Sequence, residues 1–112
     1  MAKIDERDIK KKIRKYLNTL PASKFVSYNP YPNGEAGTPD YIGCFQGLGV
    51  VIEVKAPGKD LSDIQKVRRR EWRDEAGAFH IVAYSTEDVQ RFFREFDITE
   101  EKVMEHFRKH GR

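Results

Sequence analysis

The stretch TPDYIGCF at residues 38–45, followed after a short turn by VVIEVK at residues 50–55, decides the fold of this chain. Both segments are apolar and rich in β-branched or aromatic residues, and a glycine-containing turn separates them, which is typical of a β-hairpin. Because side chains alternate along a strand, Glu53 and Lys55 share one face, and the apolar residues on either side of Glu53 take the other. The pattern predicts two charged side chains in an otherwise buried strand.

The position of Asp40 relative to Glu53 depends on where the hairpin turns. If it turns symmetrically about Gly47 and Leu48, Asp40 lies opposite Lys55 and diagonal to Glu53, on the same face. Diagonal neighbours are about 7–8 Å apart at Cα and closer at Cβ, so both carboxylates would reach one hard divalent cation. A slip of one residue would move Asp40 to the opposite face.

Each of these residues also has a simpler interpretation. Glu53 and Lys55 would point to solvent on a half-buried strand, and Asp40 would be a turn residue after Pro39, since Lys and Glu are mostly exposed in proteins. The three together favour a site. On a central strand covered on both sides, an idle carboxylate and ammonium would each cost several kcal/mol of desolvation.

The composition fits one compact domain over residues 1–112, with 38% hydrophobic and 12% aromatic residues. The net charge is +3, from 21 basic and 18 acidic residues, and the pI is about 9.0. The basic residues form two runs, which indicate a polyanionic partner such as DNA only if they flank the acidic site. They are Lys10, Lys11, Lys12, Arg14 and Lys15 in the first run, and Lys66, Arg68, Arg69 and Arg70 in the second, with Lys59 and Arg73 nearby.

Several classes of protein are not indicated by this sequence. Residues 10–16 are too charged for a signal peptide and no run approaches the length of a membrane span, so we expect a cytoplasmic protein. Cys44 stands alone, which excludes an internal disulfide, and its place beside Ile42 predicts a buried core thiol. His106 and His110 lack a third ligand nearby and are interpreted as part of a polar helix tail.

Capping and periodicity signals predict the remaining elements. Asp5 caps a first helix that Pro21 ends, a strand covers residues 24–28, and a Pro/Gly-rich loop covers residues 29–37. Ser62 and Gln65 have the spacing of a capping box that begins a helix from 63 to about 76, and Gly77 ends it. A strand over residues 79–84 and two tail helices, capped by Ser85 and Thr99, complete the chain.

The tail helices carry more apolar residues than a small sheet needs. They either cover the sheet or form a subunit interface, and the sequence does not separate the two. The residues concerned are Val89, Phe92, Phe93, Phe96, Val103, Met104 and Phe107.

The predicted order is α-β-β-β-α-β-α, with Asp40 at the start of the second strand and Glu53-x-Lys55 ending the third. It resembles the PD-(D/E)XK nuclease superfamily and, within it, the small VRR-NUC nucleases, including the stand-alone phage type. The resemblance covers about residues 5–88 and also rests on Glu6, on residues 37–40 and 52–58, and on Gln65. It implies an α/β, restriction-endonuclease-like α-β-β-β-α-β core with a mixed sheet flanked by helices, plus a C-terminal helical tail over about 86–112.

The resemblance also implies roles for individual residues. Asp40 and Glu53 match the metal-binding carboxylates of the family, Lys55 its catalytic lysine, and the backbone carbonyl of Val54 an extra ligand. Glu6 matches a first-helix glutamate that completes the site, although it would also favour the helix N-terminus. Gln65 matches a polar group close to the scissile phosphate, and its other interpretation is the reciprocal half of the capping box.

Oxygen ligands suit Mg²⁺ or Mn²⁺, which would make the chain a metal-dependent endodeoxyribonuclease. Lys55 would orient the attacking water or stabilise the developing negative charge. Without a sequence-reading module, the chain is expected to recognise DNA shape, and the stand-alone relatives favour a homodimer of Holliday-junction-resolving type in a bacterial or phage-infected cell. The alternatives are a flap or nicking nuclease, a nuclease subunit of a larger complex, or a non-catalytic nucleic-acid-binding protein.

Overall fold

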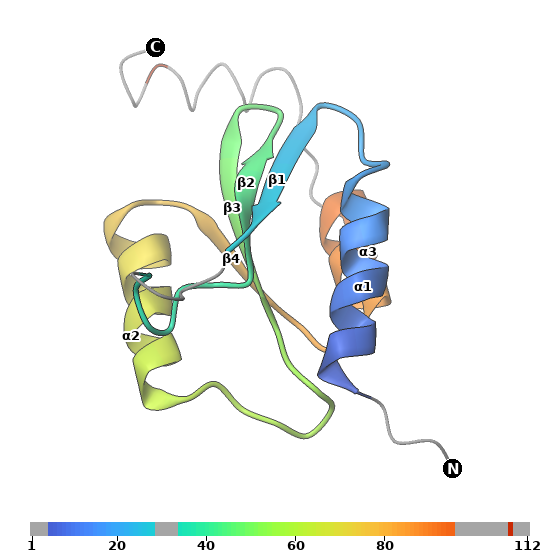
Figure 1. The fold of residues 1–112 in the computed structure, drawn as a ribbon. Helices are drawn as coiled ribbons and strands as arrows, with labels where there is room; N and C mark the ends of the chain where they lie inside the picture. The colour runs from blue at the N-terminus through green and yellow to red at the C-terminus, as the bar shows by residue number, and fades with distance from the viewer. Residues whose placement is uncertain (1–4, 29–33, 96–107, 109–112) are drawn as a thin grey trace.

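The computed structural model describes residues 5–28, 34–95 and 108, and these residues form a mixed sheet between two layers of helices (Figure 1). The strands are β1 (Ser23–Ser27), β2 (Tyr41–Phe45), β3 (Leu48–Val54) and β4 (Phe79–Ala83), in the spatial order β1-β2-β3-β4. The first two pairings are antiparallel and β3 pairs with β4 in parallel. The α/β class and the mixed sheet are as predicted.

Helices α1 (Glu6–Leu17) and α3 (Thr86–Glu95) lie on one side of the sheet. Helix α2 (Asp63–Arg70), which continues into the π-helical turn η1 (Glu71–Glu75), lies on the other (Figure 1). Asp5 caps α1 by accepting a hydrogen bond from the Arg7 amide at 2.9 Å, as the sequence predicts. The two predicted stops also hold, since α1 ends before Pro21 and Gly77 has the positive φ of +78° of a C′ residue.

The core lies between the sheet and the α1–α3 layer. Ile13, Ile52 and Val89, from α1, β3 and α3, are completely buried at its centre. Phe93 of α3 closes the upper part of this core by packing on the rings of Phe45 at 4.8 Å and Phe25 at 6.1 Å between centroids. All residues from Val50 to Val54 are buried, so the prediction of a central strand covered on both sides is confirmed.

The hairpin turns one residue earlier than the sequence pattern suggests, which moves the pairing partner of each β2 residue by two. Tyr41 pairs with Ile52 and Phe45 with Leu48, so the turn residues are Gln46 and Gly47, both at positive φ. The predicted symmetry about Gly47 and Leu48 is therefore wrong, because a two-residue hairpin turn that matches the strand twist needs positive φ at both of its residues, and Gln46 and Gly47 adopt it. A shift of two in the pairing preserves the faces of the strands, so the predicted side for the charged residues is unaffected.

Cys44 is exposed, which corrects the prediction of a buried thiol. It lies on the sheet face opposite its core neighbour Phe45, toward the α2 side. Helix α2 and η1 cover this face over β3 but leave β1 and β2 more open, since Val51 is 1% exposed and Val26 is 54% exposed.

The remaining expectations concern residues that the structure does not describe. The helix expected after Thr99, the contribution of Phe96 and the histidines of the tail lie outside the described residues, and so does the start of the Pro/Gly-rich loop at residues 29–33. Among the described helices, none combines the length and apolarity that crossing a membrane requires.

The loop that leads into β2 is fixed against α2. Gly37 adopts φ of +79°, and a Cβ added there would lie 2.9 Å from the backbone oxygen of Ile64 in the first turn of α2. Arg68 binds the same loop by donating from Nε to the Ala36 carbonyl at 3.0 Å and by pairing with Glu35. Two residues of the loop then lead from Gly37 to Asp40, so this contact positions the start of the site.

We predict that Gly37→Ala destabilises the protein more than Gly58→Ala. Both glycines have positive φ, but nothing lies within 4 Å of a Cβ at Gly58, so that variant carries only the backbone penalty of about 1 kcal/mol. Gly37→Ala adds overpacking against Ile64, worth a further 1–3 kcal/mol or so. Thermal melting of both variants measures the difference, and equal loss of stability would contradict the packing assigned to Gly37.

Candidate metal-binding and catalytic site

The site lies at the end of the sheet where Asp40 precedes β2 and Glu53 nears the end of β3. Extending the β2–β3 ladder by one residue beyond the Tyr41–Ile52 pair places Asp40 directly opposite Glu53. Asp40 is fixed to the neighbouring strand because its Oδ2 accepts a hydrogen bond from the Val54 amide at 2.7 Å. The two carboxylates therefore face one another as cross-strand neighbours, closer than the predicted diagonal pair.

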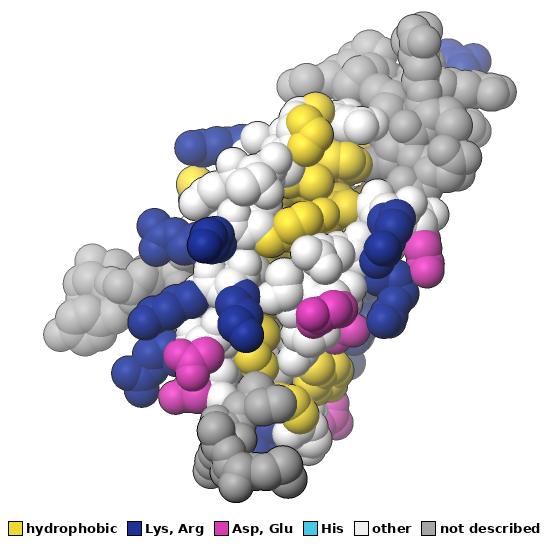
Figure 2. Space-filling view, turned by 90° about the vertical axis from the view of Figure 1, so that its right-hand side faces the viewer, with side chains coloured by type: hydrophobic (Ala, Val, Ile, Leu, Met, Phe, Trp, Pro, Cys, Tyr) yellow, Lys and Arg dark blue, Asp and Glu magenta, His cyan; other side chains and the backbone are white. Residues whose placement is uncertain are grey.

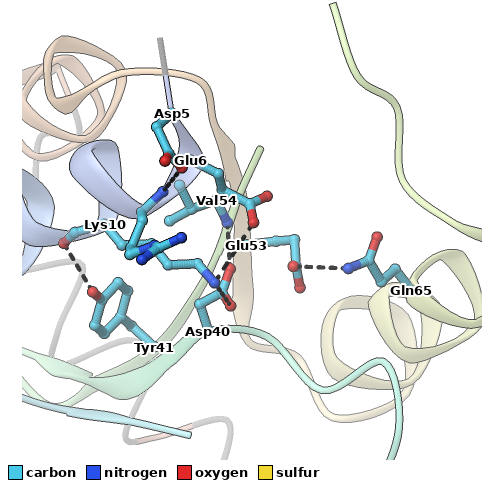
Figure 3. A network of polar contacts seen from close by, with 9 residues as sticks. Asp5, Glu6, Lys10, Asp40, Tyr41, Glu53, Val54 and Gln65 are labelled. Carbon is cyan, nitrogen blue, oxygen red and sulfur yellow. Dashed lines mark hydrogen bonds and ion pairs between the residues drawn. The ribbon is translucent and has the colours of Figure 1, made fainter. Parts of the chain in front are cut away.

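Glu53 is a buried carboxyl group, and only one of its two oxygens accepts a hydrogen bond. Its side chain belongs to a residue that is 3% exposed, and its Oε1 accepts a hydrogen bond from Nε2 of Gln65 at 3.0 Å (Figure 3). Its Oε2 is buried and has no partner. Burial raises the pKa of Glu53 to about 8, with the charge of Asp40 as a further cause, against the opposing charges of Lys55 and Lys10.

Lys10 of α1 reaches into the site and neutralises Asp40. Its Nζ lies 3.1 Å from Oδ1 of Asp40 and 3.7 Å from Oε2 of Glu6, one helical turn earlier (Figure 3). Burial alone would lower the pKa of Lys10, but Asp40, with Glu6 and Glu53, outweighs it, and the pKa is raised. Glu6 therefore lies beside the carboxylate pair, with the Lys10 ammonium bound to both Glu6 and Asp40.

The backbone of α1 is also attached to the hairpin. The Tyr41 hydroxyl donates a hydrogen bond to the carbonyl of Lys10 at 2.9 Å. Burial, and then the charge of Asp40, raise the pKa of Tyr41, so the hydroxyl keeps the proton that it donates. This contact holds the first turns of α1 over the end of the sheet.

Gln65 performs both of the roles that the sequence suggests. Its side-chain Oε1 accepts a hydrogen bond from the backbone amide of Ser62 at 2.9 Å. In return, the backbone amide of Gln65 donates to Oγ of Ser62 at 3.3 Å, which completes the capping box. The other end of the same side chain donates to Glu53. The capping box thereby fixes which end of the amide faces the carboxyl group.

Lys55 follows β3 directly and is half-buried. Its backbone amide donates to the Ala83 carbonyl at 2.9 Å, which extends the pairing with β4 by one residue. Alternation puts the Lys55 side chain on the same face as Glu53. Its charge is close enough to oppose the rise in the Glu53 pKa.

The donor set suits a hard divalent cation. Asp40 and Glu53 supply carboxylate oxygens, and the buried Oε2 of Glu53 is an acceptor without a partner. Within residues 5–28 and 34–95, no three His, Cys, Asp or Glu side chains are grouped closely enough to form a metal centre by themselves. The two facing carboxylates are thus the centre of the candidate site, and further ligation by Glu6 and the Val54 carbonyl stays a prediction.

Comparisons with known proteins support the fold independently. The chain is similar to a solved structure described as a VRR_NUC domain, with a TM-score of 0.63 and 22% identity over 81% of this chain and 96% of that one. The fold is that of a VRR-NUC domain. A scan of protein-family models finds no match to this sequence, and a search of the curated proteins finds none either.

The basic residues of this VRR-NUC fold differ in whether they form ion pairs with acidic side chains of the protein. Lys11, Lys12, Arg14 and Lys15 of α1 are exposed, and Figure 2 shows lysine and arginine side chains gathered along one flank of the face that carries α1 and α3. The second run is more engaged. Lys66 pairs with Asp60, Arg73 with Asp74, and Arg68 with Glu71, while Lys59 and Arg70 make no ion pair with another described residue.

Two contacts of the site were not predicted. The first basic run predicts that Lys10 binds DNA, whereas its ammonium pairs with Asp40 in the structure. The spacing of four between Glu6 and Lys10 is the sequence signal for this different role. Arg68, also assigned to DNA, fixes the loop before Asp40. Its neighbour Arg69 is half-buried and has a buried Nε without a partner.

We predict that Glu53→Gln stabilises the metal-free protein at high pH. The folded-state pKa of about 8 lies above the unfolded value, so the stability that protonated Glu53 contributes is present below pH 4.5 and is lost as the pH rises through 8. Gln keeps the bond to Gln65 without the buried charge. In EDTA, the melting temperature of Glu53→Gln should exceed that of the parent by several degrees at pH 9 and by much less at pH 6.

Glu75 provides the matched control, because it is exposed. Glu75→Gln removes the same charge as Glu53→Gln, but from a side chain that is not buried. Its melting temperature should follow that of the parent at both pH values. A Glu53→Gln advantage of equal size at pH 6 and pH 9 would show that charge burial is not the cause.

Proposed function

We propose that this chain is a Mg²⁺- or Mn²⁺-dependent endonuclease that hydrolyses phosphodiester bonds of DNA. The observation that carries the proposal is the facing pair of Asp40 and Glu53, with a buried, unpartnered Oε2 on Glu53. A protein gains nothing in stability from two carboxylates held together at the end of a hairpin, with one of them buried. They are explained by a cation that they would hold.

The side chains around the pair have distinct roles in this proposal. Asp40 and Glu53 would hold the metal, which, when bound, polarises a phosphoryl oxygen and lowers the pKa of a bound water. Gln65 keeps the Glu53 carboxyl in one orientation through its hydrogen bond. Lys55 would orient the attacking water or stabilise the negative charge that develops on the phosphate. Lys10 balances the charge of Asp40 and holds its orientation before the cation binds.

DNA is the proposed substrate because the site lies between two helices that carry basic residues. The first turns of α1 and α2 lie on either side of the carboxylate pair (Figure 3), and the exposed cations of α1 continue along the helix. Cations beside the site would offset the repulsion between its carboxylates and a phosphate. Contacts of this kind bind the backbone of nucleic acid without reading its sequence.

Cleavage of a labelled four-way junction in the presence of Mg²⁺ or Mn²⁺ tests the proposal. The parent should cut, while Asp40→Asn and Lys55→Ala should cut at least about 100-fold more slowly, since a loss of 2.7 kcal/mol or more of transition-state stabilisation is typical of such groups. EDTA should abolish the reaction. Gel analysis of single-turnover reactions measures the rates. Unchanged rates for both variants would show that Asp40 and Lys55 do not belong to the catalytic site.

The preference for branched DNA and the homodimer are finer parts of the same proposal. Two copies related by a twofold axis would present two sites to the two symmetric strands of a junction, as the resemblance to small stand-alone phage-type nucleases implies. The tail that was expected to join the copies lies outside the described residues. A solution mass of two chains and faster cutting of junction than of linear duplex DNA are expected.

Flap or nicking nucleases, alone or as a subunit of a larger complex, use the same catalytic residues and differ only in the DNA that they select. Faster cutting of flap or nicked DNA than of the junction would favour them and would overturn the junction part. A mass of one chain would overturn the twofold arrangement. A non-catalytic binding protein would retain DNA affinity without metal-dependent nicking, and Lys55→Ala would then change nothing.

A further inference from the structure

A groove of about 310 Å³ runs along the outer edge of strand β1. This strand is the outermost one of the sheet on its side, and α1 lies beside it (Figure 1). One wall of the groove is formed by Arg14, Leu17 and Asn18 of α1, and the other by the consecutive residues 24–27 of β1. Because side chains alternate between the two faces of a strand, consecutive residues line one groove through their shared backbone edge. The groove therefore follows the backbone of β1 over about 13 Å.

The backbone of this edge is free to pair with another strand. Tyr28 donates to the Asp40 carbonyl, so the even-numbered residues of β1 make the hydrogen bonds to β2. The amides and carbonyls of Phe25 and Ser27 then point outward, and no described strand pairs with them. An open edge of this kind is a template for an added strand, and natural proteins often cover or blunt it.

Both faces of this edge carry a positive charge. Phe25 packs on the core, so Lys24 and Val26 lie on the opposite face of β1. Arg14 lies on the α1 side of the edge. Both cations are exposed and neither forms an ion pair with a described residue, and none of the described residues that line the groove is acidic. Val26 is 54% exposed, so an added strand would also cover an apolar side chain.

These features fit an extended acidic peptide better than a phosphate or a second copy of the chain. The edge presents carbonyl oxygens as well as amides, and the carbonyls would repel a phosphate, whose oxygens accept hydrogen bonds. Pairing with β1 of a second copy would bring the cations of both copies together and supply no carboxylate. A peptide strand satisfies both kinds of backbone group, and its adjacent residues point to opposite faces, one toward Arg14 and one toward Lys24.

We propose that the β1 edge binds an extended acidic segment of a partner protein, which adds to the four-stranded sheet as a further strand. Main-chain hydrogen bonds to Phe25 and Ser27 supply affinity, and carboxylates on both faces of the segment supply specificity. This interaction goes beyond the proposed nuclease function and does not depend on it, because the carboxylates of Asp40 and Glu53 take no part in it. It would make the chain one subunit of a larger complex.

NMR titration and amide hydrogen exchange of the ¹⁵N-labelled full chain test the proposal with a designed probe. The probe is a capped eight-residue peptide of valine and threonine with two adjacent glutamates at its centre. It should bind and slow the exchange of the Phe25 and Ser27 amides, while the amides of Lys24 and Val26, which already bond to β2, change little.

Two matched peptides separate the contributions of charge and backbone. The same peptide with two lysines in place of the glutamates should bind at least about 10-fold more weakly, because both of its charges face cations. The glutamate peptide with a proline beside the glutamates should bind at least about 5-fold more weakly, because proline cannot donate to a ladder.

Variants of the chain test the two cations separately. Arg14→Ala and Lys24→Ala should each weaken binding of the glutamate peptide about 4-fold, as expected for the loss of one exposed ion pair. Arg94→Ala, which removes an exposed cation from α3, is the matched control and should change the affinity less than about 1.5-fold. Thermal melting establishes that each variant is folded.

Four results would overturn the proposal. The first two are absence of binding by the glutamate peptide and equal binding by the lysine peptide. The third is slowed exchange of the Phe25 and Ser27 amides with a DNA duplex instead of the peptide, which would assign the groove to nucleic acid. The fourth is slowed exchange without any peptide that is lost on dilution, which would identify a second copy as the occupant.

Discussion

The site depends on two carboxyl groups, Asp40 and Glu53, that face each other across the end of an antiparallel hairpin. Both would be charged in water, and a charged pair is costly here because Glu53 is buried in β3 and Asp40 is half-buried beside it. Three neighbouring groups make the arrangement tolerable: Lys10 pairs with Asp40, Gln65 donates to Glu53, and Lys55 lies on the same face. Helices α1 and α2, which carry Lys10 and Gln65, are each fixed to the sheet end by a separate hydrogen bond.

This arrangement opposes stability and suits metal binding. Glu53 holds its proton up to about pH 8 because burial and Asp40 disfavour the charged form. A cation that binds both carboxylates must displace this proton, so metal binding, charge state and folding are linked. Strain of this kind is expected where a protein retains groups for chemistry rather than for packing.

The sequence predicts the local features of this structure well and the relations between distant elements less well. The Asp5 cap, the capping box at Ser62 and the face of Glu53 follow from spacing within a few residues, and all three are confirmed. The turn lies one residue earlier than predicted, and the pairing shifts by two, because the turn geometry, which apolar alternation does not encode, sets the register. The pairing of Lys10 with Asp40 and the exposure of Cys44 depend on where helices dock, which no local pattern determines.

The central claim is that the facing carboxylates form one metal site, and calorimetric titration of Mn²⁺ into the metal-free full chain tests it most directly. Titration in two buffers of different ionisation enthalpy gives the protons released on binding. At pH 7, below the Glu53 pKa of about 8, one ion should bind with release of close to one proton. Asp40→Asn should abolish this binding over the Mn²⁺ concentrations at which the parent binds. Binding of equal strength to the parent and to Asp40→Asn, without proton release, would contradict the account.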